Sequence, residues 1–105
     1  MITVNVAKQF TRFPSGRYAK NGDTSGEAFR ERFLEGPISR GESVVVELDG
    51  TIGYGSSFLE EAFGGLVRKL KILPSSLKAR LTLVSAESLL LEEILGYIDD
   101  AGAEI

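Results

Sequence analysis

The sequence of 105 residues contains no cysteine, no histidine and no tryptophan. Without cysteine, the chain cannot form disulfides, cysteine-ligated zinc sites or thiol nucleophiles. Without histidine, it cannot form a Ser-His-Asp triad, a histidine-ligated metal site or an imidazole acid or base. Because catalysis would have to depend on carboxylates, lysine, tyrosine or a bound group, we expect that the chain is not an enzyme and uses no cofactor or metal.

The sequence also lacks long apolar runs and a strong net charge. No stretch approaches the roughly 20 apolar residues of a membrane span, and the N-terminus has no signal-peptide pattern. The formal net charge of −3 argues against nucleic acid as the main partner. We therefore expect a cytoplasmic protein that binds neither membrane nor nucleic acid. Its length and even composition predict one domain over residues 1–105.

Three strands are predicted where apolar and β-branched residues gather, at residues 2–6, 44–48 and 81–84. The second is nearly all apolar, so we expect a central strand covered on both faces. Residues 103–105 could begin a further edge strand. Because helices are predicted between the strands, the pattern indicates an α/β fold with a substantially parallel sheet.

The first predicted helix follows a turn-rich segment at residues 10–22. Thr24 and Glu27 have the spacing of a capping box at its start, and Gly36-Pro37 should end it. Residues 30–32 are expected to face water.

A loop is predicted at residues 73–76, and the last helix is expected to begin at a cap on Ser85 and to stop at Gly102.

The middle helix, ending near Leu70, carries an apolar stripe on one side. Glu60 and Glu61 are expected to complement the dipole of its first turn, since adjacent helical positions do not form a paired-carboxylate site. Gly64-Gly65 lowers helix stability by about 1 kcal/mol per glycine, which indicates close approach by a neighbouring element or a partner.

A glycine-punctuated loop precedes this helix and ends in Ser56 and Ser57. It follows a central strand, where open α/β sheets place ligands, and a helix N-terminus favours negative charge. Three interpretations stay open: Ser56 is only the N-cap of the helix, the loop is a regulatory or recognition site, or it binds a small phosphate ligand. The loop has neither phosphate-binding glycine pattern, because it lacks the lysine of one and the spacing of the other.

Two further groups are candidates for a site. Asp49, at the end of the central strand, could bind a metal or orient a serine hydroxyl, or simply form an Asp-Gly turn. Arg12, Arg17, Tyr18 and Lys20 form a basic and aromatic cluster that could meet an anionic ligand or could be an ordinary surface loop.

The stretch from Leu48 to Leu59 resembles the STAS domain of bacterial anti-sigma-factor antagonists. In that family a central strand ends in an aspartate, here Asp49, and a serine pair opens the next helix. Ser56 and Ser57 match the serine pair, and Leu59 matches the leucine after it. The second serine is the phosphoacceptor of the family, so the resemblance implies Ser57. The chain departs from that family pattern at positions 55 and 58, where it has Gly and Phe in place of Asp and Gly.

Over most of its length the chain is similar to the STAS-like domain family of unknown function. The shared motifs are Gly16-Arg17-Tyr18, the segment SGEAFRERF at residues 25–33, and the segments VVELDG and YGSSFLEEAFGGL. This resemblance implies a STAS-like α/β domain with a mixed, largely parallel sheet of about four to five strands and about three helices. Members tend to accompany histidine-kinase-like ATPase domains, which implies a kinase or ATPase partner of anti-sigma type.

We therefore expect a non-enzymatic regulatory module that binds a protein through the loop at residues 53–58 and the first turns of its helix. Phosphorylation of Ser57 would switch the interface. The alternative is a nucleotide or other phosphate held in the same loop, with Arg17 or Lys20 supplying charge. A third hypothesis is a homodimer formed by the Gly64-Gly65 face and a sheet edge. The residues expected to take part are Ser56 and Ser57 as phosphoacceptor candidates, with Asp49, Gly53, Tyr54, Gly55, Phe58, Arg17 and Tyr18 at the partner or ligand site.

Overall fold

The computed structural model describes residues 1–104 and contains one sheet of three parallel strands. These are β1 (Ile2–Asn5), β2 (Val44–Glu47) and β3 (Leu81–Val84), in the order β1-β2-β3. The three strands lie where the sequence predicts them, and β2 is central as expected. The sheet is smaller than the four to five strands implied by the resemblance. Ala103 and Glu104 form a turn, so an edge strand does not begin there, and Ile105 lies outside the described residues.

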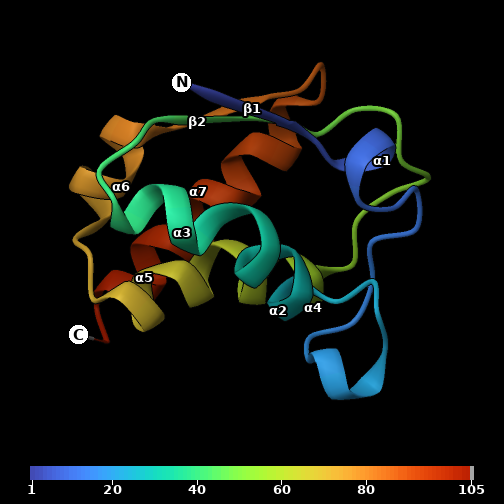
Figure 1. The fold of residues 1–105 in the computed structure, drawn as a ribbon, viewed down its shortest axis with the longest axis horizontal. Coiled ribbons are helices and arrows are strands. Elements are labelled where there is room, and N and C mark those ends of the chain that lie inside the picture. Colours follow the sequence, from blue (N-terminus) through green and yellow to red (C-terminus); the bar gives the residue numbers. More distant parts are fainter. Residues whose placement is uncertain (105) are drawn as a thin grey trace.

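Helices cover only one face of this sheet, as Figure 1 shows with β1 and β2 along the top of the molecule. The inward-facing Val4, Val44 and Val46 are at most 2% exposed. Side chains alternate along a strand, so the residues between them point to the open face. These outward residues are Thr3, Asn5, Val45, Glu47, Thr82 and Val84, all exposed or half-buried. The expectation that β2 is covered on both faces is wrong, because polar side chains on this face can remain in contact with water.

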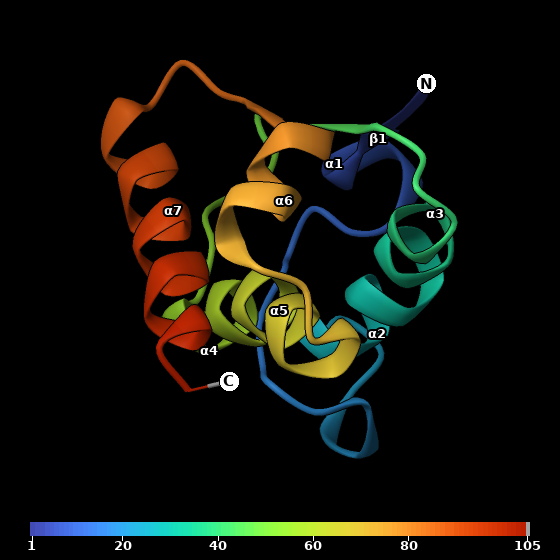
Figure 2. The same ribbon diagram turned by 90° about the vertical axis from the view of Figure 1, so that its left-hand side faces the viewer.

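Within residues 1–104, five helices, two more than expected, pack against the covered face and around the ends of the sheet (Figure 2). The short α1 (Val6–Gln9) follows β1 directly. Two of the five are composite, each made of two α-helical parts joined by a π-helical part. The first composite helix consists of α2 (Gly26–Phe29), η2 (Arg30–Leu34) and α3 (Glu35–Ser39), and the second of α4 (Ser56–Leu59), η3 (Glu60–Gly64) and α5 (Gly65–Leu70). The others are α6 (Pro74–Arg80) and α7 (Ser88–Gly102), and a single 3₁₀ turn, η1 (Ala19–Asn21), lies in the turn-rich segment.

The helix boundaries correct several predictions. Ser25, not Thr24, is the N-cap of α2, and its hydroxyl accepts a hydrogen bond from the Ala28 N–H at 3.1 Å. Glu27 instead accepts from the Ala19 N–H at 2.9 Å, so the capping box does not form. The helix also continues through Gly36-Pro37 to Ser39. Pro37 lies in the first turn of α3, just after the π-helical turn, and a proline is tolerated in a first turn.

Two further boundaries differ from the sequence analysis. Residues 74–76 begin helix α6 and do not form a loop, because Pro74 is its first residue, where the fixed φ of proline favours helix initiation. Helix α7 begins at Ser88 with Glu87 as N-cap, so Ser85 does not cap it. The predicted end of α7 at Gly102 is confirmed.

Glycines allow the two composite helices and α7 to pack very closely. A Cβ on Gly26 would collide with the Phe58 carbonyl oxygen, and one on Gly64 would lie 3.2 Å from the Tyr97 carbonyl oxygen. A Cβ on Gly65 would collide with the Arg30 guanidinium. The close approach inferred from Gly64-Gly65 is therefore packing within the chain. Both glycines are buried within the chain, so neither is exposed to a second copy.

Candidate functional site

The candidate loop connects the end of β2 to the start of α4 and lies beside the segment of residues 12–15. The Ile52 N–H donates to the Arg12 carbonyl at 3.0 Å, and the Gly55 N–H donates to the Pro14 carbonyl at 3.4 Å. Gly53 is exposed and has φ of +138°, a conformation that favours glycine. Glycine at this position therefore sets the path of the loop toward the helix.

Ser56 and Ser57 are the first two residues of α4, after the N-cap Gly55. Both serines are exposed, and no side chain caps this helix. The interpretation of Ser56 as the N-cap is wrong, because the N-cap is Gly55 and Ser56 is already the first residue of the helix. Within residues 1–104 neither hydroxyl makes a hydrogen bond, so both are presented to solvent beside the free N–H groups of the first turn.

Asp49 joins the ends of β2 and β3. One carboxylate oxygen accepts from the Ser85 hydroxyl at 2.6 Å and the other from the Ala86 N–H at 2.9 Å. These two hydrogen bonds, that of Ser85 first, lower the pKa of Asp49. Asp49 thus does orient a serine hydroxyl, but that of Ser85, and it fixes the loop before α7. The structure brings Asp49 to neither Ser56 nor Ser57.

The side chains of Tyr54 and Phe58 point into the molecule and pack against the core under the loop. The Tyr54 hydroxyl donates to the Leu48 carbonyl at 2.6 Å, and burial raises the pKa of Tyr54 to about 12. Phe58 is completely buried, 5.9 Å from Tyr54 and also 5.9 Å from Phe29 between ring centroids. The prediction that Phe58 contacts a partner is therefore wrong, because its side chain belongs to the aromatic core.

Two apolar side chains that the sequence analysis missed are exposed near the serines. Ile52 is 71% exposed and Phe13 is 57% exposed. They line a shallow hollow of about 370 Å³ formed by residues 13–15 and 52–55. Exposed apolar side chains that gather at one place are typical of interaction surfaces. The signal in the sequence was an isoleucine in a glycine-rich loop with no predicted strand or helix to bury it.

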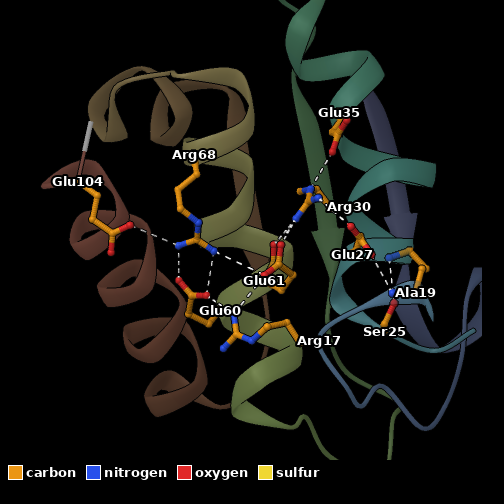
Figure 3. A network of polar contacts seen from close by, with 11 residues as sticks. Arg17, Ala19, Ser25, Glu27, Arg30, Glu35, Glu60, Glu61, Arg68 and Glu104 are labelled. Atoms are coloured by element: carbon orange, nitrogen blue, oxygen red, sulfur yellow. Dashed lines mark hydrogen bonds and ion pairs between the residues drawn. The ribbon is translucent and has the colours of Figure 1, made fainter. Parts of the chain in front are cut away.

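Arg17 is bound to the second composite helix and is not a free cation. Its Nη1 lies 2.5 Å from Glu60 Oε1 and 3.1 Å from Glu61 Oε1, and the hydrogen bond to Glu60 is the main cause of its raised pKa. In Figure 3 its guanidinium lies below both carboxylates, toward the first turn of the helix. The other members of the predicted cluster do not join it. Tyr18 is 44% exposed beside Lys20, whose ammonium lies 5.9 Å from the ring centroid, and Arg12 is exposed.

Glu60 and Glu61 are the centre of a network of ion pairs and not simple dipole complements (Figure 3). Arg68 donates two hydrogen bonds to Glu60, at 2.6 and 2.9 Å. Glu60 therefore has a lowered pKa, for which the hydrogen bond from Arg68 is the largest cause.

Arg30 is the buried end of this network. It was expected to face water, but it is 5% exposed, because the close approach at Gly26 and Gly65 closes the helix pair around it. Its Nη1 lies 2.5 Å from Glu61 Oε2, and its Nε lies 2.7 Å from Glu35. Burial would lower the pKa of Arg30, but the hydrogen bonds to Glu35 and Glu61 outweigh it and raise the pKa.

Residues 25–89 match the family model of the STAS-like domain of unknown function. The chain belongs to this family. No curated protein and no solved structure gives a match to the chain.

The matched part of this STAS-like domain runs from α2 to the start of α7, so it includes both composite helices and the serine loop. Within residues 1–104 we find no group of acidic side chains arranged to hold a metal ion. No helix in this part is long and apolar enough to cross a membrane. The serine loop presents two hydroxyls and an apolar rim on one surface, beside the ion-pair network of Glu60 and Glu61.

Proposed function

We propose that this STAS-like domain is a non-enzymatic regulatory module whose partner-binding surface is the loop at residues 50–57 with the first turn of α4. Phosphorylation of Ser57 switches this surface off. The observation that carries the proposal is that Ser56 and Ser57 are exposed at a helix start without capping it. Because the structural role of a cap is not used, the hydroxyls are free for recognition or modification.

The apolar rim supplies the contact with the partner. Ile52 and Phe13 are more than half exposed and would be buried by a protein seated on the loop. Tyr54 and Asp49 serve the site indirectly, because their hydrogen bonds to Leu48, Ser85 and Ala86 hold the loop in place.

A phosphate on Ser57 would change the interface more than the fold. It adds about −1.5 to −2 charges at the positive end of a helix, where the free N–H groups favour an anion. A partner matched to neutral hydroxyls and apolar side chains would lose affinity, since it would have to bury that charge without a counter-ion. The family resemblance favours a histidine-kinase-like ATPase of anti-sigma type as this partner.

The alternative, a phosphate ligand in the same loop, has less support from the geometry. The neighbouring hollow of about 300 Å³ is lined by residues 48–54 with Ala86 and Glu87, and it includes two carboxylates and no cation. Arg17, which was expected to supply positive charge, does not line this hollow.

The test compares partner binding by matched serine variants. Tagged wild-type protein is used to capture the partner from a lysate of the source cells, and affinities are then measured with the purified partner. We expect Ser57→Ala to bind like wild type and Ser57→Asp to bind at least about tenfold more weakly, a difference of about 1.4 kcal/mol.

Ser75→Asp is the matched control. Ser75 is also exposed and is also the second residue of a helix, α6, but it lies outside the serine loop. We expect it to bind like wild type. Equal affinity of Ser57→Asp and wild type would refute the proposal.

A further inference from the structure

Arg17 lies where it can respond to a phosphate on Ser57. Ser57 precedes Glu60 by three residues and Glu61 by four, so the three side chains lie on the same face of the helix, with Cβ atoms about 5–6 Å apart. Arg17 binds both glutamates, and in Figure 3 its guanidinium lies on the side of the first turn. The guanidinium therefore lies over the face of the helix that also carries Ser57.

Arg17 also has hydrogen-bond donors to spare. Both of its ion pairs use Nη1, and its Nη2 and Nε make no hydrogen bond within residues 1–104. The side chain is 32% exposed, so it can reorient without opening the core. A guanidinium can bind phosphate oxygens through two of its nitrogens at once. Because both carboxylates are bound by Nη1 alone, the other two nitrogens of Arg17 can make such a contact.

The backbone around Arg17 is hydrogen-bonded to the first residues of α2. The Gly26 N–H donates to the Gly16 carbonyl, and the Glu27 N–H donates to the Arg17 carbonyl, each at 3.0 Å. The nearest atom to a Cβ built on Gly55 is the Ser15 Cα, at 3.9 Å. The segment that carries Arg17 thus passes the start of α4 at a fixed distance.

We infer that Arg17 is the residue that reads phosphorylation of Ser57, by moving its free guanidinium nitrogens from solvent onto the phosphate while Nη1 loosens from Glu61. The inference rests on the proposed function, in which a kinase transfers the phosphoryl group of ATP to the serine hydroxyl. Glu60 and Glu61 repel the phosphate, and Arg17 offsets this repulsion. The modification therefore acts on the segment at residues 14–18 as well as on the partner surface.

The test installs phosphoserine at position 57 during translation, so the titration needs neither the kinase nor the partner. Binding of the purified partner is measured separately on the same proteins. The titration of the phosphate is followed by ³¹P NMR in the wild-type background and in Arg17→Gln. An arginine beside the phosphate favours its dianion, so we expect the titration midpoint in the wild-type background to lie lower by about one pH unit. Arg17→Lys, which keeps the charge and loses the fork, should fall between the two.

Lys20→Gln is the matched control, because it removes a cation from the same segment whose ammonium lies beside the Tyr18 ring. Its titration should match that of wild type. Equal midpoints in the wild-type and Arg17→Gln proteins would overturn the inference, and so would a Lys20→Gln effect as large as that of Arg17→Gln. A lowered midpoint in a protein that still binds its partner would refute the proposed function alone. Loss of the partner without any Arg17 effect would refute this inference alone.

Discussion

The start and the middle of the helix formed by α4, η3 and α5 differ in how their polar groups are used. In its middle, Glu60 and Glu61 are bound by Arg17, Arg30 and Arg68 and lie partly or fully in the protein interior. At its start, Ser56 and Ser57 are exposed and cap nothing. One helix therefore carries two glutamates that are bound within the chain and two serines that are exposed to solvent.

Within this one continuous sequence motif, the residues that stabilise the fold are different from the residues that are exposed for a partner. The glutamates and glycines of the segment EEAFGG join this helix to α2 and α7, since buried charges need partners and close helices need small residues. The serines directly before it have no such role. The family resemblance covers the whole segment. It therefore supports the fold mainly through the glutamates and glycines, and the function only through the serines.

The largest expected effect on stability comes from removing Arg30, the buried arginine of the ion-pair network. Arg30→Met leaves Glu61 9% exposed without its closest cation, and we expect the free energy of unfolding to fall by about 3 kcal/mol. The value lies at the low end for buried pairs because Glu61 keeps Arg17 and Arg68 nearby. Urea denaturation followed by circular dichroism measures it.

Arg40→Met is the control for Arg30→Met, because Arg40 pairs with Glu42 on the surface with its side chain 62% exposed. Its effect should stay within about 0.5 kcal/mol. A loss at Arg30 no larger than this would show that the network contributes nothing to stability.

The next effect tests the close approach that buries the network. Gly26→Ala places a Cβ against the Phe58 carbonyl oxygen and 3.0 Å from the Ala62 nitrogen. Both are backbone atoms that cannot move independently of the helix, so we expect a loss of about 2–3 kcal/mol in thermal or urea unfolding.

Gly96→Ala is the opposite case, since a Cβ there meets no atom within 4 Å in the middle of α7. It should raise stability by up to about 1 kcal/mol because alanine favours a helix. Similar losses at both glycines would contradict the packing described for Gly26.

A smaller effect is expected from the pH dependence of the network. The pKa of Glu60 is lowered in the folded state, chiefly by the hydrogen bond from Arg68, relative to an unfolded value of 4.5. Its contribution to stability is therefore complete above pH 4.5 and is lost as the pH falls through the folded pKa. We expect wild-type protein to lose more stability on acidification below that pH than Glu60→Gln does. The glutamate is partly exposed, so the difference should shrink in high salt; parallel acid profiles of the two proteins would contradict it.

A feature could be predicted from the sequence where the residues that form it are close together in the chain. Strands and long helices were found because apolar periodicity is a local signal, as at β2 and at the stripe of α4 and α5. Arg30 was assigned to the surface because its ion pair with Glu61 joins residues far apart in the chain, which no local pattern records. Pro74 was assigned to a loop although the same residue type can also begin a helix.

At the candidate site, the sequence predicted that Ser56 and Ser57 lie at the start of a helix but did not predict their geometry. The choice between Gly55 and Ser56 as N-cap is a difference of one residue, and helix ends are the least certain feature of any pattern. Phe58 was placed at the interface because it is next to the serines, but the helix turns it by about 100° into the core.

The smallest effect compares serines at the starts of two helices. Ser25 is 1% exposed and its hydroxyl accepts the Ala28 N–H, so Ser25→Ala should lower the free energy of unfolding by about 1 kcal/mol. Ser57→Ala should change it by less than about 0.5 kcal/mol, because the hydroxyl makes no hydrogen bond that the folded state would lose. Parallel urea titrations of the two variants measure the difference. A loss at position 57 equal to that at position 25 would mean that Ser57 stabilises the helix after all, and its hydroxyl would then not be free for a partner.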